Sequence, residues 1–311
     1  MDTIEIHPSL LMNEVYFPWV ETPGFVVDVL ERLSEDEFYK AWEVGTQFSA
    51  HDRARLRQLV EQSRRPLTQW LTPMLEGQNL WLSSLDSSER QQAVQRVREH
   101  LPLAAETGVS TLAVVSGSDP GDKDRAEALK GFTESLANIC SDAEEFGMNV
   151  IVEPLDRFAH KKRVVGTTPD TVALIDEVRR AHPNVGFAFD SAHAALNEEV
   201  LFDVLESAAH QIVQLHLSNA ILDKRDPGYG DFHMQPGAPG FLTEEVAAGL
   251  ISRAVELGIG ANGGLRVAVE ARGKIGNSPD MLADNVRAFL KRVVAIASMS
   301  SESSAHRPER V

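Results

Sequence analysis

The chain has 311 residues, of which 46 are acidic and 30 are basic, and its formal net charge is −16. A surface this acidic repels nucleic acid and anionic membranes, so we expect neither as a partner. Apolar residues make up 43% of the chain, which is enough for a large core, and the single Cys140 excludes a disulfide framework and suits a reducing cytoplasm.

Short apolar runs typical of buried strands recur along the whole chain. They fall at residues 4–7, 38–44, 66–71, 111–115, 149–152, 185–189, 211–215 and 265–269. Segments with helical spacing or with helix-start and helix-stop residues alternate with them, at residues 25–33, 53–62, 86–106, 126–146, 168–181, 198–209, 243–257 and 279–296. Eight such alternations predict an α/β fold of the (β/α)8 TIM barrel type.

The alternative fold is an open, doubly wound sheet, which would need a glycine-rich turn after the first strand, and the sequence has none there. We expect one domain over residues 1–296, with loops over residues 7–20 and 219–241. Residues 297–311 are polar and predict a disordered tail. No cationic and apolar leader opens the chain, and no apolar run reaches the ~18–20 residues that span a bilayer, so we predict a cytoplasmic protein.

Four consecutive predicted strands, the fifth to the eighth, end in a side chain that can bind a metal. These side chains are Glu153, Asp190, His216 and Glu270. The carboxyl ends of barrel strands share one rim, so the four should converge there. A salt bridge or a helix cap would explain any one of them alone, but the set predicts a metal site. Three carboxylates and one imidazole suit one Mn²⁺, Mg²⁺ or Co²⁺ ion better than a structural Zn²⁺.

Further polar residues follow the same strands and fall into two groups. The group that we interpret as functional comprises His193, Asp231 and His233. The group that follows the fifth strand comprises His160, Lys161 and Lys162. For His160, a functional position and a solvated loop position explain the pattern equally well. The two lysines we interpret as solvated loop residues.

The order of these motifs resembles the xylose isomerase-like TIM barrel superfamily. The motifs are EPL after the fifth strand, D-x-x-H after the sixth, a histidine ending the seventh, D-x-H in the next loop and a final glutamate. The resemblance covers residues 111–292 and, more loosely, the first strand. It implies a sugar substrate and one divalent ion, with Mn²⁺ expected.

The resemblance also implies roles for single residues. In the ketose 3-epimerases of that superfamily, the glutamates that match Glu153 and Glu270 exchange a proton on opposite faces of the substrate. The histidine that matches His193 holds substrate oxygens there. We expect Asp231, His233 and Arg272 to contact the substrate as well.

One position departs from the epimerases, which carry a further glutamate where this chain has Ala159. The string EPLDRFAHKK followed by VGTT looks more like the catalytic subunit of bacterial C-glycoside deglycosidases. That resemblance implies a 3-keto glycoside substrate, loss of the C2 proton and elimination of the aglycone from C1, with His160 as base or acid. It also implies a small second subunit, and we expect an oligomer. Elimination is our leading expectation.

Two other activities stay open at this point. A sugar or sugar-phosphate isomerase or epimerase would use the same centre, and Arg157, Arg225 and Arg272 are candidates for holding a phosphate. A nuclease of the endonuclease IV type would need more metal ligands and a basic groove, which the net charge of −16 disfavours.

Overall fold

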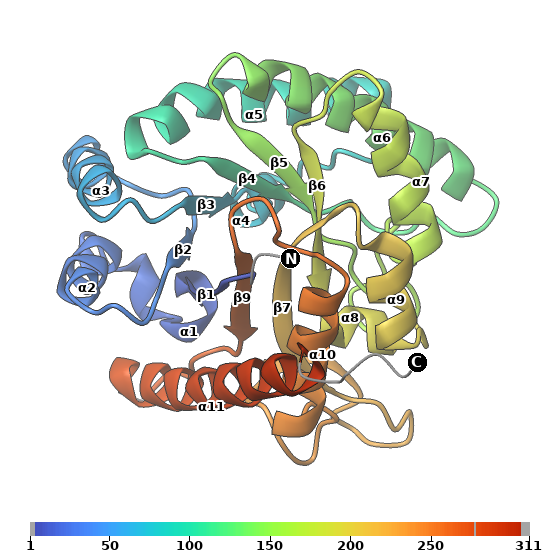
Figure 1. Cartoon of the computed structure of the whole chain (residues 1–311). Helices are drawn as coiled ribbons and strands as arrows, with labels where there is room; N and C mark the ends of the chain where they lie inside the picture. Colours follow the sequence, from blue (N-terminus) through green and yellow to red (C-terminus); the bar gives the residue numbers. More distant parts are fainter. Residues whose placement is uncertain (1–3, 277, 306–311) are drawn as a thin grey trace.

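The computed structural model describes residues 4–276 and 278–305 (Figure 1). The strands are β1 (Ile6–Leu11), β2 (Ala41–Val44), β3 (Leu67–Trp70), β4 (Thr111–Val114), β5 (Asn149–Val152), β6 (Val185–Asp190), β7 (Ile212–Ile221), β8 (Gly230–Met234) and β9 (Leu265–Glu270). The α-helices are α1 (Met12–Val15), α2 (Phe25–Ser34), α3 (Ala50–Ser63), α4 (Thr72–Glu76), α5 (Ser87–Thr107), α6 (Arg125–Glu144), α7 (Thr168–Arg179), α8 (Ser191–Leu196), α9 (Leu201–Ala208), α10 (Glu244–Glu256) and α11 (Pro279–Ala305), and a 3₁₀ turn, η1, spans Trp19–Glu21. Within these described ranges, no helix is long and apolar enough to cross a membrane.

In the described part of the chain, eight strands form a closed parallel barrel. Their order is β6-β5-β4-β3-β2-β1-β9-β7, and a further pairing of β6 with β7 closes the ring. Strand β8 lies outside the ring as an antiparallel partner of β7. The longer helices surround the barrel in Figure 1, since each crossover between parallel strands returns along the outer face. The predicted (β/α)8 TIM barrel is therefore confirmed, and the closed ring rules out the open sheet.

Successive side chains along each strand point to opposite faces of the sheet, and this divides the core into two layers. Residues on the outward faces pack under the helices in one large cluster, whereas their neighbours along each strand point into the barrel. The inward cluster comprises Leu11, Trp70, Ala113, Ile151, Ala188 and Ala268. Because half of these side chains are alanines, they leave room inside the barrel for polar side chains at the carboxyl-terminal rim.

The first strand differs from the prediction, which placed it at residues 4–7. Strand β1 instead runs through Pro8 and pairs with β2 and β9. Pro8 has no backbone N–H to donate, and its carbonyl accepts a hydrogen bond from the backbone N–H of Lys40 at 2.8 Å, just before β2 begins. The pairing of β1 with β2 starts only at Ser9, so the missing N–H of Pro8 is tolerated. The predicted loop over residues 7–20 therefore contains most of β1, the whole of α1 and the start of η1.

Two later segments also carry more regular structure than predicted. The loop expected over residues 219–241 contains the end of β7 and the whole of β8, which pair as a hairpin. The tail expected from residue 297 begins as helix, because α11 continues through Ala305 and Ala297 is buried against the core. No glycine or proline interrupts the sequence before Pro308, so nothing local stops the helix. Residues 306–311 of the predicted tail lie outside the described residues.

Candidate metal centre

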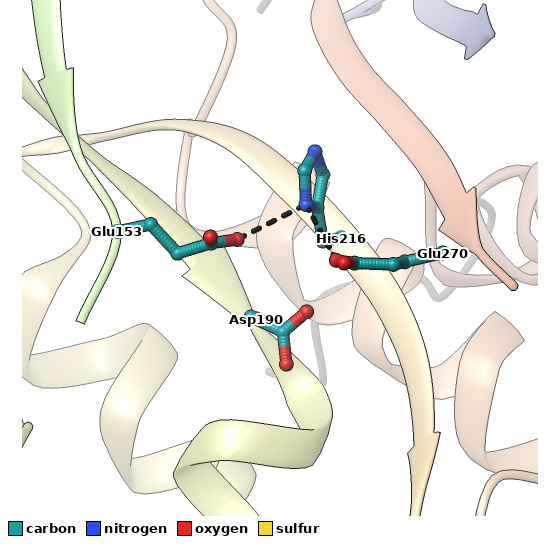
Figure 2. Close-up of side chains that lie close together, drawn as sticks. All are labelled: Glu153, Asp190, His216 and Glu270. Carbon is teal, nitrogen blue, oxygen red and sulfur yellow. Dashed lines mark hydrogen bonds and ion pairs between the residues drawn. The ribbon is translucent and has the colours of Figure 1, made fainter. Parts of the chain in front are cut away.

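The four strand-end residues converge at the carboxyl-terminal rim of the barrel (Figure 2). Glu153 follows β5, Asp190 and Glu270 end β6 and β9, and His216 lies within β7. One ligand atom from each lies within 4.8 Å of all the others, and the four side chains are buried. Parallel pairing brings them together, since Asp190 is in register with His216 and Glu270 with Ser218. Figure 2 shows Glu153 and Glu270 reaching toward His216 from opposite sides.

The His216 imidazole contacts both glutamates through one ring nitrogen. Its Nδ1 atom lies 3.1 Å from Glu153 Oε1 and 3.1 Å from Glu270 Oε2. One N–H can donate to only one of these oxygens, and Glu153 Oε1 is buried without a hydrogen-bond partner. A buried acceptor left unpaired costs free energy. The donor set and this orphaned oxygen therefore fit a divalent ion that would bind all four side chains.

Asp190 both belongs to the cluster and caps helix α8, which the sequence did not predict. Its Oδ1 atom accepts from the backbone N–H groups of Ala192 at 2.8 Å and His193 at 2.9 Å, and its Oδ2 atom accepts from Ser218 Oγ. Burial raises the pKa of Asp190 to about 6, and the charge of Glu270 adds to that effect while His193 opposes it. A nearby cation would stabilise the charged form of this carboxylate.

A fifth carboxylate, Glu43 of β2, lies behind His216 and is completely buried. Its Oε2 atom accepts hydrogen bonds from Trp70 Nε1 at 2.9 Å, Gln214 Nε2 at 2.8 Å and His216 Nε2 at 3.0 Å, and Ser9 Oγ donates to Oε1 at 2.7 Å. Because Nε2–H of His216 points to Glu43, its Nδ1 atom faces the cluster, as metal binding requires. The sequence analysis missed Glu43, although a lone charge in an apolar strand was a signal.

The pKa values of this pair are strongly shifted. Burial works to lower the pKa of His216, but the charge of Glu43 and the close contacts with Glu43, Glu153 and Glu270 raise it well above its usual range. Burial works to raise the pKa of Glu43, but the charge and hydrogen bond of His216 lower it to about 2. The cluster thus concentrates negative charge around one imidazole, which favours a bound cation.

Replacing Glu43 by glutamine is expected to weaken metal binding about 10–100-fold, since partners behind metal-bound histidines contribute about this much. The amide keeps the shape of the side chain but removes the charge that orients His216. Competition between the protein and a chelator for Mn²⁺ measures the affinity. Asp52→Asn changes a buried carboxylate outside the centre and serves as the control. Equal Mn²⁺ affinity in a folded Glu43→Gln variant would contradict this assignment.

A cavity of about 270 Å³ opens at three of the four clustered side chains, Glu153, His216 and Glu270. Its polar and charged lining comprises Asn13, Glu14, Thr72, Glu76, Glu153, Lys161, Arg163, His193, His216, His233, Glu270 and Arg272. Six of the residues predicted from the sequence are in this set. Two others, Asp190 and Asp231, are buried beside the cavity.

Lys161 also lines the cavity, which corrects the interpretation of this residue as a solvated loop lysine. Its Nζ atom lies 3.2 Å from Asp231 Oδ2 and 3.0 Å from His233 Nε2. Asp156, which is completely buried, fixes the loop by accepting hydrogen bonds from the backbone N–H groups of His160 and Lys161. The direction of a side chain in such an irregular loop depends on these tertiary contacts, which the sequence does not display.

His160 is exposed and does not line this cavity. Its ring stacks on Phe232 with the ring centres 4.3 Å apart, and its Nδ1–H donates to the carbonyl oxygen of Asp231 at 2.5 Å. This position argues against the role of acid or base that the sequence analysis gave to His160.

His193 is buried next to the four-residue cluster and lines the cavity. Its Nδ1 atom lies 3.4 Å from Asp156 Oδ2, and its Nε2 atom lies 3.7 Å from Asp231 Oδ2. Burial works to lower the pKa of His193, but the charge of Asp190 and the hydrogen bond with Asp156 raise it to about 9. A charged imidazole at this place can donate a hydrogen bond to an oxygen atom in the cavity.

Glu14, which the sequence analysis also missed, connects two predicted substrate-binding residues. Arg272 donates to both Glu14 oxygens, from Nε at 2.5 Å and from Nη2 at 2.7 Å, and His233 Nδ1 lies 2.6 Å from Oε2. Glu14, His233 and Glu270 also offer ligand atoms within 4.8 Å of one another. Because Arg272 occupies both oxygens of Glu14, we assign this group to the cavity wall and not to a second ion.

Comparison with known proteins places the chain among barrels of one kind. A family model described as xylose isomerase-like TIM barrel matches residues 33–246. No curated protein sequence matches significantly.

A solved structure of D-psicose 3-epimerase with D-tagatose, from Clostridium cellulolyticum H10, is 17% identical with a TM-score of 0.68. The 3-keto-D-glucoside 4-epimerase YcjR from E. coli is 17% identical (TM-score 0.66), and the IolI protein with a binding zinc atom is 16% identical (TM-score 0.69). Each match covers 94% of this chain and 99% of the other. Identities this low show likeness of fold.

Proposed function

Because the chain belongs to the xylose isomerase-like TIM barrel family, we propose that it is a metal-dependent enzyme that transfers a proton on a keto sugar, as sugar isomerases and epimerases do. The observation that carries this proposal is the buried cluster of four side chains at a cavity of about 270 Å³, in which Glu153 and Glu270 lie on opposite sides of His216. Two of the similar structures are sugar epimerases by name, which supports a sugar substrate.

The residues of the cluster divide the work between binding and proton transfer. Glu153, Asp190, His216 and Glu270 would hold one divalent ion, and we propose Mn²⁺ because oxygen-rich sites suit it. When bound, such an ion supplies Lewis-acid stabilisation of negative charge on substrate oxygens. Glu153 and Glu270 both line the cavity, and they approach His216 from opposite sides (Figure 2), so we propose that each takes or returns the proton of a carbon held between them.

The other charged residues of the cavity would orient the sugar. His193 and Lys161 present N–H donors to the cavity, and both are positioned by buried aspartates. A donor that meets the oxygen on which charge develops favours the transition state over the ground state. We propose that these two residues bind the carbonyl and hydroxyl oxygens next to the reacting carbon. His233, whose Nε2 atom lies 3.0 Å from Lys161 Nζ, and Arg272 line the same cavity.

Elimination from a 3-keto glycoside is the second candidate, because it begins with the same proton transfer. A glutamate would take the C2 proton, the C1–C2 double bond would form, and the bond from C1 to the aglycone would break. The leaving group then needs a proton, and since His160 lies outside the metal cavity, we propose Lys161 as its donor. Ala159 favours this candidate over simple ketose epimerisation. A small second subunit and an oligomeric assembly belong to the same proposal.

Solvent exchange distinguishes these reactions. The Mn²⁺-loaded protein is incubated in D₂O with a free ketohexose and with methyl 3-keto-glucoside, and the sugars are followed by NMR. We expect deuterium at the carbon next to the carbonyl group. New epimers that keep their substituents would identify an epimerase, whereas released methanol or another aglycone would identify elimination. Absence of exchange in every keto sugar, with metal fully bound, would contradict both candidates.

A further inference from the structure

Residues 153–167, which connect β5 to α7, form a long loop that contains no helix or strand. Loops of this length in a compact domain usually have a function or are disordered. This loop brings Lys161 and Arg163 to the metal cavity. Since regular backbone pairing ends with β5, the polar groups of its backbone need hydrogen-bond partners from other parts of the chain.

Asn197, which follows the last residue of helix α8, forms three hydrogen bonds with the backbone of this loop. Its Oδ1 atom accepts from the N–H of Arg157 at 2.8 Å. Its Nδ2 group donates to the carbonyl oxygen of Gly166 at 3.0 Å and, at a longer 3.4 Å, to that of Leu155. Because Asn197 is buried, each lost bond would leave a backbone group unpaired, which costs free energy.

Two of these hydrogen bonds lie on either side of Asp156 in the chain. Asn197 therefore fixes the peptide groups before and after this residue. The Asp156 carboxylate is completely buried, and its two oxygens accept from the backbone N–H of Lys161 at 3.0 Å and 3.1 Å. This contact closes the loop around the carboxylate and sets the point from which the Lys161 side chain extends. A displacement of Asp156 would therefore displace Lys161.

Helix α8 connects the same loop to the metal cluster (Figure 1). Asp190 caps the start of the helix. The backbone N–H of Asn197 donates to the carbonyl oxygen of His193 at 3.0 Å, so these two residues lie one turn apart on the same face. Both contact the loop, since His193 Nδ1 lies 3.4 Å from Asp156 Oδ2. One short helix thus holds a proposed metal ligand at its start, a cavity donor in its middle and the loop of Lys161 at its end.

Lys161 needs this support because its side chain is long and flexible. Its Nζ atom lies 3.2 Å from Asp231 Oδ2, so the ammonium group is held by a contact at its tip and by the position of its backbone. A shift of the backbone would carry the ammonium group away from a substrate oxygen in the cavity. A misplacement of about 1 Å can cost about 10²-fold in rate.

We propose that Asn197 is a positioning residue that acts through Lys161. It aligns the loop so that the ammonium group meets the oxygens of the bound sugar. This inference rests on the proposed function, which gives Lys161 that task. Asn197 itself does not line the metal cavity and would not touch the sugar.

The test replaces Asn197 by aspartate, which keeps an acceptor for the N–H of Arg157 and loses both donors. Turnover of the Mn²⁺-loaded protein, measured as exchange of methyl 3-keto-glucoside in D₂O, should fall about 10²-fold. The double variant with Lys161→Met should be no slower than Lys161→Met alone, because a residue that acts through Lys161 then has nothing left to position. Asn197→Ala, which adds no charge, should give the same result. Effects that multiply in the double variants would overturn the inference.

Asn184→Asp is the matched control. Asn184 precedes β6, at the end of the barrel away from the cluster, and its Nδ2 group also donates to two backbone carbonyls, those of Cys140 at 2.9 Å and Met148 at 3.1 Å. This variant loses the same kind of hydrogen bonds, so it should lose thermal stability but keep its turnover. An equal loss of turnover in Asn184→Asp and Asn197→Asp would show that Asn197 has a structural task only.

A measurement without substrate separates this inference from the proposed function. Reductive methylation with ¹³C-formaldehyde labels the lysines and keeps their charge, and the NMR signal that is missing in Lys161→Met belongs to Lys161. This signal should shift in Asn197→Asp and stay in place in Asn184→Asp. An unchanged signal in folded Asn197→Asp overturns the inference, whatever the activity. A shifted signal in a protein that exchanges no keto sugar supports the positioning by Asn197 and contradicts the proposed function.

Discussion

Replacing Asp190 by asparagine is expected to lower turnover about 10³-fold, because the variant would lose much of its bound metal. Lewis-acid stabilisation of charge on a substrate oxygen is worth several kcal/mol, and each 1.36 kcal/mol corresponds to a factor of about ten in rate. The fold should survive, since asparagine is as good an N-cap as aspartate and can still accept from Ala192 and His193 at the start of α8. Metal content after gel filtration, turnover and thermal unfolding measure the three effects.

The control for this prediction is Asp203→Asn, which removes one negative charge from an exposed position on α9. It should keep metal content and turnover. Removal of metal from the wild-type protein with a chelator should reproduce the loss seen in Asp190→Asn, and added Mn²⁺ should reverse it. Full activity of the metal-free protein would show that the cluster has a structural task only.

Replacing Glu153 or Glu270 by glutamine is expected to reduce epimerisation about 10²–10⁴-fold, the usual contribution of a positioned acid or base. The two variants should differ in a diagnostic way. If the glutamates act from opposite sides, each variant loses proton removal from one face and keeps it on the other. Glu153→Gln should therefore exchange deuterium into one substrate epimer and Glu270→Gln into the other, which NMR in D₂O distinguishes.

Metal content must be measured in both glutamine variants, because these residues are also proposed ligands. Comparison at saturating Mn²⁺ removes the effect of weakened binding. Residual exchange into the same epimer in both variants would show that neither glutamate is required for proton transfer on that face. In that case Lys161, whose Nζ atom lies 3.2 Å from Asp231 Oδ2 and 3.0 Å from His233 Nε2, becomes the candidate base for that face.

Lys161 lines the metal cavity and its neighbour His160 does not, a difference that the sequence does not predict. The two residues are adjacent in a loop without regular structure, and both are polar, so the sequence could not decide which of them enters the cavity. Asp156 and Asp231 decide it, because their buried carboxylates bind the backbone of this loop and the Lys161 ammonium group. Asp156 follows β5 and Asp231 lies in β8, so these acids are far apart in the chain and only folding brings them together.

Glu43 and Glu14 were missed for a related reason. Each lies on or next to an early strand, far in sequence from its partners. The role of each depends on a contact with a residue from the second half of the chain. Glu43 meets His216, and Glu14 meets His233 and Arg272. A lone acid in an apolar segment indicates a buried partner, but it does not identify that partner.

The sequence by itself determined the barrel and the convergence of the four clustered side chains. Eight buried strands leave few stable arrangements, and the parallel barrel places every strand end on one rim, so Glu153, Asp190, His216 and Glu270 had to meet. The tertiary structure decided the rest: which loop side chains enter the cavity and which carboxylate orients His216. Those features depend on loop paths and on contacts between distant segments, which local periodicity does not encode.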